Sequence, residues 1–249
     1  MTNEQDDAFR AQLEELKSEF LNVVAHELRT PVTIARWSTE VVLDGYYGKI
    51  ENRKVEEALE KSYEAMGRLN ESLNGIITAL LAAENKITLA QGPVSLREFL
   101  DDTILHHHPR IIQKGITLNI AHEEAPKEVH ADKSALRHIV HTLLENAVDY
   151  TPEGGAITLT ATSGDCGCAH LSVTDSGVGV PPECRSAIFE KFYRGKWAVA
   201  MKPDGLGLNL FIAKKFAEAH GGTLVIEETS QEKGSQFTCV IPTKEITAH

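Results

Sequence analysis

Apolar residues recur at steps of three and four along the first part of the chain. This spacing places them on one face of a helix, and it is typical of a helix that packs against another helix. The clearest stretch contains Leu13, Leu16, Phe20 and Val23. The pattern predicts one long helix over residues 8–43, bent near Pro31 because proline has no amide proton to donate to the preceding turn.

The same periodicity returns over residues 53–83, after a segment in which Gly45 and Gly48 indicate a helix end and a turn. The apolar face of this second helix consists of Val55, Leu59, Met66, Leu69, Leu73, Ile76, Ile77 and Leu80. Two such helices form an antiparallel hairpin, which cannot bury both apolar faces by itself. We expect a second copy of the chain to complete a four-helix bundle, because the rest of this chain predicts no further helices of that length.

The pattern changes at Gly92 and Pro93, beyond which shorter helices alternate with strands. Helices are predicted over residues 94–112, 133–150 and 208–219. Strands are predicted for ITLNI, EVHAD, TLVIEE and SQFTCVIP, with a hairpin over residues 157–161 and 171–173. This order is typical of a two-layer α/β sandwich. We therefore expect a helical hairpin domain over residues 1–90 and an α/β domain over residues 91–249.

Composition narrows the range of functions. The chain has 249 residues, of which 42% are hydrophobic and 24% charged, as is usual for a globular protein in water. A net charge of −11 argues against a protein that binds nucleic acid by neutralising phosphates. No apolar run is long enough to span a bilayer, and the first residues do not resemble a signal peptide. We therefore expect a cytoplasmic protein without a membrane segment in this chain.

The stretch FLNVVAHELRTP places His26 at the edge of the apolar face, near water. The adjacent Glu27 could hold the proton on one ring nitrogen and so strengthen the other nitrogen as a nucleophile. A histidine with a surface or core role is the alternative. A second pair, His122 and Glu123, follows a predicted strand, and we interpret it as solvated. A metalloprotease helix is excluded, because HExxH needs histidine where the chain has Thr30.

Two segments of the second domain carry residues suited to a nucleotide. Asn146 lies in the predicted helix HTLLENAVDY, where its amide needs a partner and could give one oxygen ligand to Mg²⁺; a structural role is the alternative. In VTDSGVGVPP a strand ends at Asp175, whose carboxylate can accept a hydrogen bond from an amine. Gly177 and Gly179 let the backbone approach a ligand closely, although DxGxG is also found in ordinary turns.

A third segment, DGLGLNLFIAKKF, is a glycine-rich entry into the helix predicted over residues 208–219. Exposed amides and the positive end of the helix dipole favour phosphate at such a position. The segment has neither the GxxxxGK[ST] of a P-loop nor the GxGxxG of a Rossmann unit. It therefore favours a phosphate contact outside those two common motifs.

Six segments, taken in order, resemble the sequence boxes of sensor histidine kinases. They are FLNVVAHELRTP for the phosphoacceptor box, LLENAVDYTPEGG for N, DSGVGVP for G1, IFEKFYRG for F, GLGLN for G2 and KGSQF for G3. The resemblance covers residues 10–243, and six boxes in order are specific where each alone is weak. It implies a dimeric helical hairpin that carries the phosphoacceptor, followed by an ATP-binding α/β sandwich shared with gyrase-type and MutL-type ATPases.

The resemblance also implies an activity and its partners. His26 would be phosphorylated by ATP and would pass the phosphoryl group to an aspartate on the receiver domain of a response regulator. Glu27 would accept the proton of His26, and Thr30 would help to position water for dephosphorylation of the regulator. The chain would act as a homodimer, as a cytoplasmic kinase or as the soluble core of a larger sensor protein.

In the second domain the resemblance implies contacts with ATP and Mg²⁺. Asn146 would hold Mg²⁺, Tyr150 would lie beside the nucleotide, and Asp175 would bind the adenine amine. Four glycines would border the ligand, Gly177 and Gly179 at the base and Gly205 and Gly207 at the phosphates. Residues 192–204 would form a mobile lid, whose cations Arg194 and Lys196 would be available to the phosphates.

Three positions depart from the family pattern. The chain has Thr142 where the family usually has asparagine, Asp149 where it has lysine or arginine, and Asn209 where it has a third glycine. Asp149 puts a negative charge beside the phosphates, so we expect altered ATP affinity or lid geometry. We hypothesise that a cation compensates, with Arg194, Lys191 and Lys196 as the candidates.

Two other functions stay open from the sequence. A degenerate kinase could act mainly as a phosphatase or a dimeric scaffold, as the departures from the pattern suggest. A conformational ATPase of the gyrase or MutL kind would share the second domain. The stretch AHELRTP, and the lack of a following transducer domain in this sequence, favour the histidine kinase.

Overall fold

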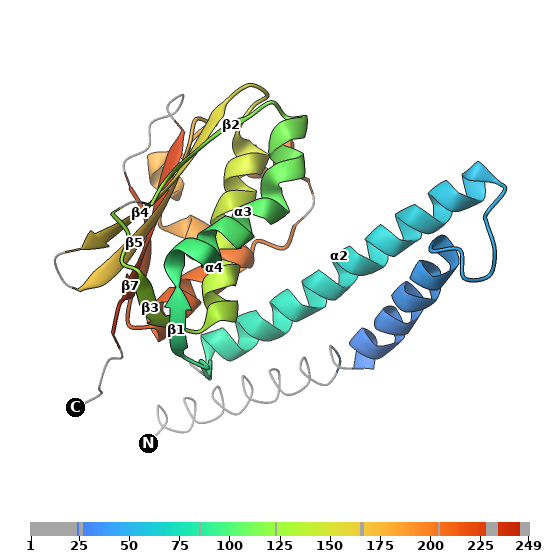
Figure 1. Cartoon of the computed structure of the whole chain (residues 1–249), viewed down its shortest axis with the longest axis horizontal. Coiled ribbons are helices and arrows are strands. Elements are labelled where there is room, and N and C mark those ends of the chain that lie inside the picture. The colour runs from blue at the N-terminus through green and yellow to red at the C-terminus, as the bar shows by residue number, and fades with distance from the viewer. Residues whose placement is uncertain are drawn as a thin grey trace, which may run out of the picture. The chain divides into compact units, whose positions relative to one another are not determined.

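The computed structural model describes residue 24 and residues 27–84, 86–122, 124–164, 167–203, 205–227 and 234–244. The chain forms two compact units, Met1–Glu84 and Asn85–His249 (Figure 1). His26 lies outside the described residues, so its position at the edge of the apolar face stays a prediction. Within the described ranges, no helix is long and apolar enough to cross a membrane.

The first unit is a helical hairpin, as the periodicity predicted. Its first helix is described over residues 27–43 and continues through Pro31. The second helix, α2, spans Arg53–Ala83, which are the predicted bounds. It begins after Asn52, whose side chain accepts a hydrogen bond from the amide of Lys54 at 3.0 Å and so caps the first turn.

A polar contact joins the two helices, while apolar side chains stay at the surface. Arg36 Nη2 donates to the hydroxyl of Tyr63 at 3.1 Å, and the guanidinium carbon lies 4.6 Å from the centre of the Tyr63 ring. Trp37, Ile34 and Leu69 are 64%, 59% and 47% exposed. The single hairpin therefore leaves much of its apolar seam in contact with water.

The second unit contains a mixed five-stranded sheet in the order β2-β4-β5-β7-β6. The strands are β2 (Thr117–Ala121), β4 (Ala156–Gly164), β5 (Cys168–Asp175), β6 (Thr223–Ile226) and β7 (Ser235–Pro242). β2 runs parallel to β4, and the other neighbours are antiparallel. A separate antiparallel pair joins β1 (Gly92–Ser95) to β3 (Glu128–Ala131).

Helices cover one face of this sheet, which gives the predicted two-layer α/β sandwich. They are α3 (Leu96–Gln113), α4 (Lys133–Tyr150) and α6 (Asn209–Ala219), and Figure 1 shows α3 and α4 together on that face. α4 contacts both β5 and α6. The core between the layers includes the fully buried Leu136, Ile139, Leu143, Leu144, Ile157, Leu159, Leu171, Ile212 and Leu224. Because these side chains are buried in the core, only the remaining faces of α4 and β5 are available for a site.

α4 has its predicted bounds because both ends carry clear signals. At its start, Asp132 Oδ1 accepts hydrogen bonds from the amides of Ser134 and Ala135 at 2.9 and 3.0 Å. At its end, Thr151 has an extended backbone and Pro152 follows, and the residue before a proline disfavours the helical region. This places the last turns of α4 next to the end of β5.

Two segments differ from the predictions. The helix predicted to begin at residue 94 begins at Leu96, because Gly92–Ser95 pair with β3 as a strand. Glycine and proline at the start of that segment disfavour a helix. The region predicted only as a lid contains a short helix, α5 (Lys196–Met201). Six residues are too few for helical periodicity to be recognised in a sequence.

Candidate functional site

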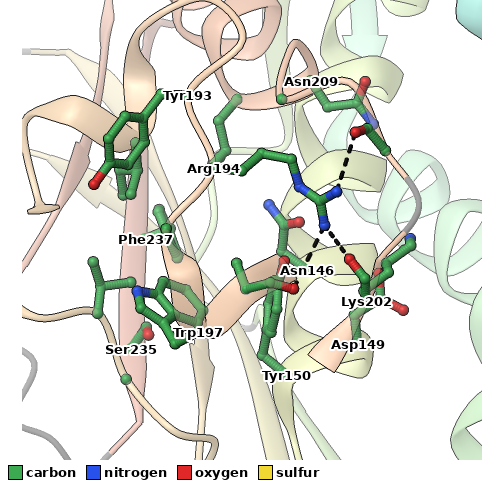
Figure 2. A pocket seen from close by; sticks show the side chains of 18 of the residues that line it. Asn146, Asp149, Tyr150, Tyr193, Arg194, Trp197, Lys202, Asn209, Ser235 and Phe237 are labelled. Atoms are coloured by element: carbon green, nitrogen blue, oxygen red, sulfur yellow. Dashed lines mark hydrogen bonds and ion pairs between the residues drawn. The ribbon is translucent and has the colours of Figure 1, made fainter. Parts of the chain in front are cut away.

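The second unit has a pocket where the last turns of α4 meet the end of β5. Its walls also come from the segment that contains α5, from the start of α6 and from β7 (Figure 2). The cavity has a volume of about 150 Å³. The lining residues are Asn146, Asp149, Tyr150, Asp175, Gly179, Val180, Ile188, Tyr193, Arg194, Gly195, Trp197, Ala198, Lys202, Gly205, Leu206, Gly207, Asn209, Leu210, Ser235 and Phe237. One end is mostly apolar and the other carries charges.

Asp175 is the buried acid of the apolar end. It is the last residue of β5 and is only 6% exposed. Its Oδ1 accepts hydrogen bonds from the amides of Gly177 at 2.8 Å and Ser235 at 3.3 Å. Burial raises the pKa of this carboxyl to about 6, although the two amide hydrogen bonds oppose the shift. Among the described residues none donates to Oδ2, which is therefore available to a donor in the pocket.

Gly177 makes room for this arrangement, although it does not itself line the cavity. A Cβ at position 177 would lie 2.4 Å from the carbonyl oxygen of Tyr150 and 2.7 Å from Oδ1 of Asp175. Both distances are far below a normal van der Waals contact, and one of the two atoms belongs to the backbone. The glycine therefore lets the end of α4 and the carboxylate of β5 approach each other.

We predict that Gly177→Ala displaces Asp175 and weakens nucleotide binding by about tenfold or more, since one misplaced buried polar contact costs about 1–3 kcal/mol. Titration of the non-hydrolysable analogue AMPPNP by calorimetry measures the loss. Gly92→Ala is the matched control, because a Cβ there meets no atom within 4 Å. An unchanged affinity in Gly177→Ala would contradict the close approach described here.

Aromatic side chains form a wall beside the acid. The rings of Tyr150 on α4 and Trp197 on α5 meet edge to face, with 5.1 Å between centroids and an interplanar angle of 67°. Phe237 on β7 also lines the pocket, and its ring meets that of Phe189 at 6.4 Å. Flat apolar surfaces next to an acceptor of hydrogen bonds suit a planar base that carries an amine.

The other end of the pocket carries charges of both signs. Lys202 Nζ lies 2.6 Å from Oδ2 of Asp149 and 3.5 Å from Oε1 of Glu145. Asp149 Oδ1 also accepts a hydrogen bond from Nη2 of Arg110 on α3 at 2.5 Å. Burial alone would lower the pKa of Lys202, but the hydrogen bond and charge of Asp149, together with Glu145, outweigh it and raise the pKa. Lys202 is therefore a firmly protonated cation at the pocket.

Arg194 also lines the pocket, but its guanidinium is committed to the backbone. Nη1 donates to the carbonyl oxygens of Pro203 at 2.6 Å and Gly205 at 3.2 Å. Nη2 donates to the carbonyl oxygens of Lys202 and Ala198 (Figure 2). Arg194 thus fixes the shape of the loop that follows α5.

The structure brings together most, but not all, of the residues predicted for the nucleotide site. Those that line the pocket are Asn146, Tyr150, Asp175, Gly179, Arg194, Gly205 and Gly207. Gly177 does not line the pocket, but it allows the end of α4 to approach the carboxylate of Asp175. Lys191 lies with its Nζ 5.4 Å from the centre of the Phe211 ring, and Lys196 is exposed at the start of α5, so neither lines this pocket.

Several lining residues were not singled out from the sequence, among them Trp197, Lys202, Ser235 and Phe237. Trp197 was the most accessible to prediction, because tryptophan is rare in this chain and lies in the expected lid. Ser235 and Phe237 lie in KGSQF, the segment that resembles the G3 box, but their position beside Asp175 follows only from the sheet order. Lys202 gave no local signal, since its partner Asp149 is distant in sequence.

Two of the residues predicted for the first unit, Glu27 and Thr30, lie on its first helix. Glu27 and Thr30 are both exposed. Arg29 lies between these two residues in the sequence, and its Nη2 donates a hydrogen bond to Oδ1 of Asn74 on α2 at 2.6 Å. His26 is outside the described residues, so the geometry of the pair His26 and Glu27 stays a prediction.

The pocket lies on a mixed sheet that is covered by helices. It combines an acid at the end of a strand with an aromatic wall and a charged end, and this combination defines a nucleotide-binding domain. Residues 131–245 match the family described as histidine kinase-, DNA gyrase B- and HSP90-like ATPase. Residues 16–83 match the His kinase A (phospho-acceptor) domain. The chain therefore belongs to the sensor histidine kinases, of which it has the two domains of the catalytic core.

Relatives of known type support the same family. The chain is 29% identical over 237 residues to the signal transduction histidine-protein kinase/phosphatase MprB of Mycobacterium avium, covering 93% of this chain and 44% of MprB. It is 33% identical over 232 residues to the phosphate regulon sensor protein PhoR of Pseudomonas aeruginosa, covering 92% and 50%. The chain thus spans half or less of the length of these relatives.

Solved structures agree with the fold. Full-length ShkA in complex with AMPPNP superposes with a TM-score of 0.74 at 28% identity, over 92% of this chain and 47% of ShkA. The mycobacterial sensor histidine kinase MprB superposes with a TM-score of 0.53 at 29% identity, over 63% of this chain and all of that structure. The prediction of a sensor histidine kinase core with an α/β sandwich is confirmed.

Proposed function

We propose that the chain transfers the γ-phosphoryl group of ATP to His26 and then to an aspartate on the receiver domain of a response regulator. The observation that carries the proposal is the pocket between Asp175 and Lys202, on the same chain as a phosphoacceptor domain that contains the sequence AHELRTP. A nucleotide site without such a helix would equally suit an ATPase. The two together favour a protein-histidine kinase.

The chemistry of the pocket suits ATP in one orientation. Adenine fits the apolar end, where Oδ2 of Asp175 would accept a hydrogen bond from the exocyclic amine and Tyr150 would contact the ring. Gly205 and Gly207 border the opposite end, next to Lys202. Both glycines have positive φ, of 128° and 69°, and glycine reaches such conformations without strain. The phosphates would therefore lie along the segment from Gly205 to the start of α6.

Asn146 is the residue that would hold Mg²⁺. Its side chain comes from the pocket side of α4, one turn before Tyr150, and its amide oxygen is a suitable hard ligand. The described residues include no cluster of three histidine, cysteine or acidic side chains that could hold a metal by themselves. Phosphate oxygens and water would then complete the coordination, and the bound ion would offset phosphate charge.

At the acceptor, a neutral imidazole would attack the γ-phosphorus in line with the leaving ADP oxygen. Glu27 would take the proton from the other ring nitrogen of His26, which increases the nucleophilicity of the attacking one. Phosphoryl transfer requires mainly that the protein position the reacting groups and stabilise the charge of the transition state. The two ends of the pocket would supply both. Thr30 would position water when the regulator is dephosphorylated, a second activity named for the relative MprB.

We also propose that the chain acts as a homodimer. Leu69 belongs to the apolar face predicted for α2, Ile34 and Trp37 lie on the first helix, and all three side chains are exposed. Exposed apolar side chains at helical spacing favour burial against another helix pair, and a second copy of the same hairpin provides one.

Incubation with γ-labelled ATP tests the proposed function and separates it from the alternatives. We expect protein-bound phosphate that is stable in base and lost in acid, as phosphohistidine is, and that moves to a receiver domain added afterwards. Free phosphate alone would indicate a conformational ATPase. Neither product, despite AMPPNP binding, would indicate a degenerate kinase, and release of phosphate from a phosphorylated receiver domain would identify it as a phosphatase.

A further inference from the structure

Four charged side chains of the second unit meet between the end of α4 and the loop after α5. Asp149 lies between two cations, with Oδ1 2.5 Å from Arg110 Nη2 and Oδ2 2.6 Å from Lys202 Nζ. Glu145 lies one turn earlier on α4, 3.5 Å from Lys202 and 3.7 Å from Arg110. The carboxylate of Asp149 is only 6% exposed, while the Lys202 side chain is 40% exposed. A partly exposed cation is thus paired with a buried anion.

Lys202 is the lining cation that can change partners. The lining residues of the pocket include two cations, Arg194 and Lys202. Arg194 uses both terminal nitrogens to hold carbonyl oxygens of its own loop, and these bonds would have to break before it could bind an anion. Among the described residues, only side-chain carboxylates hold the ammonium of Lys202, and its flexible stem lets the ammonium rotate toward the cavity.

The same contact holds the lid against α4. Lys202 follows α5 directly, and Trp197 on α5 packs against Tyr150 on α4. The cavity beneath is about 150 Å³, whereas pockets for ligands of nucleotide size usually measure roughly 300–1,000 Å³. A movement of α5 away from α4 would enlarge the cavity, and the ion pair between Lys202 and Asp149 opposes that movement.

We propose that Asp149 and Lys202 form a latch that a triphosphate opens by taking Lys202 from the carboxylate. The proposal rests on the proposed function, since it assumes that the pocket binds ATP. In the closed state the cation neutralises Asp149 and keeps the lid on the pocket. In the bound state it neutralises phosphate instead, while Arg110 stays with Asp149. AMP lacks the β- and γ-phosphates that would extend to Lys202, so the latch selects for the length of the phosphate chain.

Binding of AMPPNP and AMP to three single variants tests the latch. We expect Lys202→Ala to raise the Kd of AMPPNP about tenfold through loss of one charge-assisted contact, but not to raise the Kd of AMP, which makes no such contact. Asp149→Asn removes the competing anion and is expected to lower the Kd of AMPPNP about threefold or more, and also to lower that of AMP, because the lid is released for either nucleotide. Lys133→Ala, at the other end of α4 and exposed, controls for the loss of a positive charge in Lys202→Ala.

Trp197 provides a second readout that a merely structural role would not change. Trp37 is the other tryptophan of the chain and lies exposed on the first helix, so the background variant Trp37→Phe isolates the emission of Trp197. We expect AMPPNP to shift this emission as the indole leaves Tyr150. In Asp149→Asn we expect part of that shift before any nucleotide is added, because the latch is already released.

Three results would overturn the latch. They are an equal loss of AMP and AMPPNP affinity in Lys202→Ala, a weaker binding of AMPPNP by Asp149→Asn, and an unchanged Trp197 emission in Asp149→Asn. Each of them leaves AMPPNP binding by the unmodified chain, and so leaves the proposed function intact. Failure of the unmodified chain to bind AMPPNP would instead overturn both the latch and the proposed function.

Discussion

A protein with the substitution His26→Gln is expected to bind AMPPNP with unchanged affinity and to acquire no acid-labile phosphate from ATP. Glutamine has about the length of histidine and can form hydrogen bonds, but its amide nitrogen is not nucleophilic because its lone pair is delocalised. The expected loss is complete, since covalent transfer has no acceptor, and no rearrangement of charge in the pocket can replace it. The nucleotide contacts lie in the other unit and should be unaffected.

The measurement is a time course of labelling with γ-labelled ATP, with AMPPNP titration of the same preparations. His122→Gln is the matched control, because His122 is the other histidine of the chain that is followed directly by glutamate. Its Nε2 lies 3.4 Å from Oδ1 of Asp101, which indicates a structural partner. Labelling of His26→Gln at the rate of the unmodified chain would place the acceptor elsewhere, and loss of labelling in His122→Gln instead would identify the acceptor as His122.

Long periodic elements were the most predictable part of the fold. α2 and α4 have their predicted bounds because periodicity, the capping residues Asn52 and Asp132 and the breaking residue Pro152 all agree locally. The hairpin of β4 and β5 and the strands β6 and β7 were also predicted, from alternation. These signals lie within about twenty residues of the element that they define, and a sequence displays them directly.

The charge balance of the pocket was not predictable in the same way. The sequence identified Asp149 as an anion beside the phosphates and suggested Arg194, Lys191 or Lys196 as its compensation. In the structure Asp149 pairs with Arg110 and Lys202, which are 39 and 53 residues away in the chain. Long side chains reach their partners only through the packing of α3, α4 and the lid, so the pairing follows from the tertiary structure and has no local signature.

Asp175 shows what the sequence and the structure each contribute. The motif placed a carboxylate and glycines at the end of a strand, which indicated the base of a nucleotide. Only the structure shows that this carboxylate is buried, and that both of its backbone donors contact the same oxygen. This geometry leads to a prediction in which binding and stability change in opposite directions.

The substitution Asp175→Asn is expected to weaken AMPPNP binding at least about a hundredfold and, at neutral pH, to stabilise the second unit. The asparagine Oδ1 can keep the hydrogen bonds from Gly177 and Ser235. Its Nδ2 must then point into the pocket, where a donor would oppose the adenine amine instead of accepting from it. Stability should rise because the variant no longer buries an ionised carboxylate.

The pH dependence follows from the raised pKa. The Asp175 carboxyl has a pKa of about 6 in the folded chain and an ordinary value of 3.8 when exposed. Between these values the folded state binds more protons than the unfolded state, so the free energy of unfolding falls as the pH rises from about 4 to about 6. Above that range the ionised group costs about 3 kcal/mol, which Asp175→Asn should restore. At low pH the two proteins should converge in stability.

Urea denaturation at several pH values from 4 to 8, followed through the emission of Trp197 in the Trp37→Phe background, measures the difference between the two proteins. The other carboxyl groups titrate equally in both, so the difference isolates Asp175. Glu153→Gln, which removes an exposed carboxylate next to the end of α4, is the control and should show no such divergence.

A lower stability of Asp175→Asn at pH 7 would mean that the charge of Asp175 is compensated inside the fold. Retained AMPPNP affinity would mean that the adenine amine binds elsewhere. The expected combination, a more stable unit that no longer binds nucleotide, would instead indicate that the folded chain sustains the cost of a buried charge for its function.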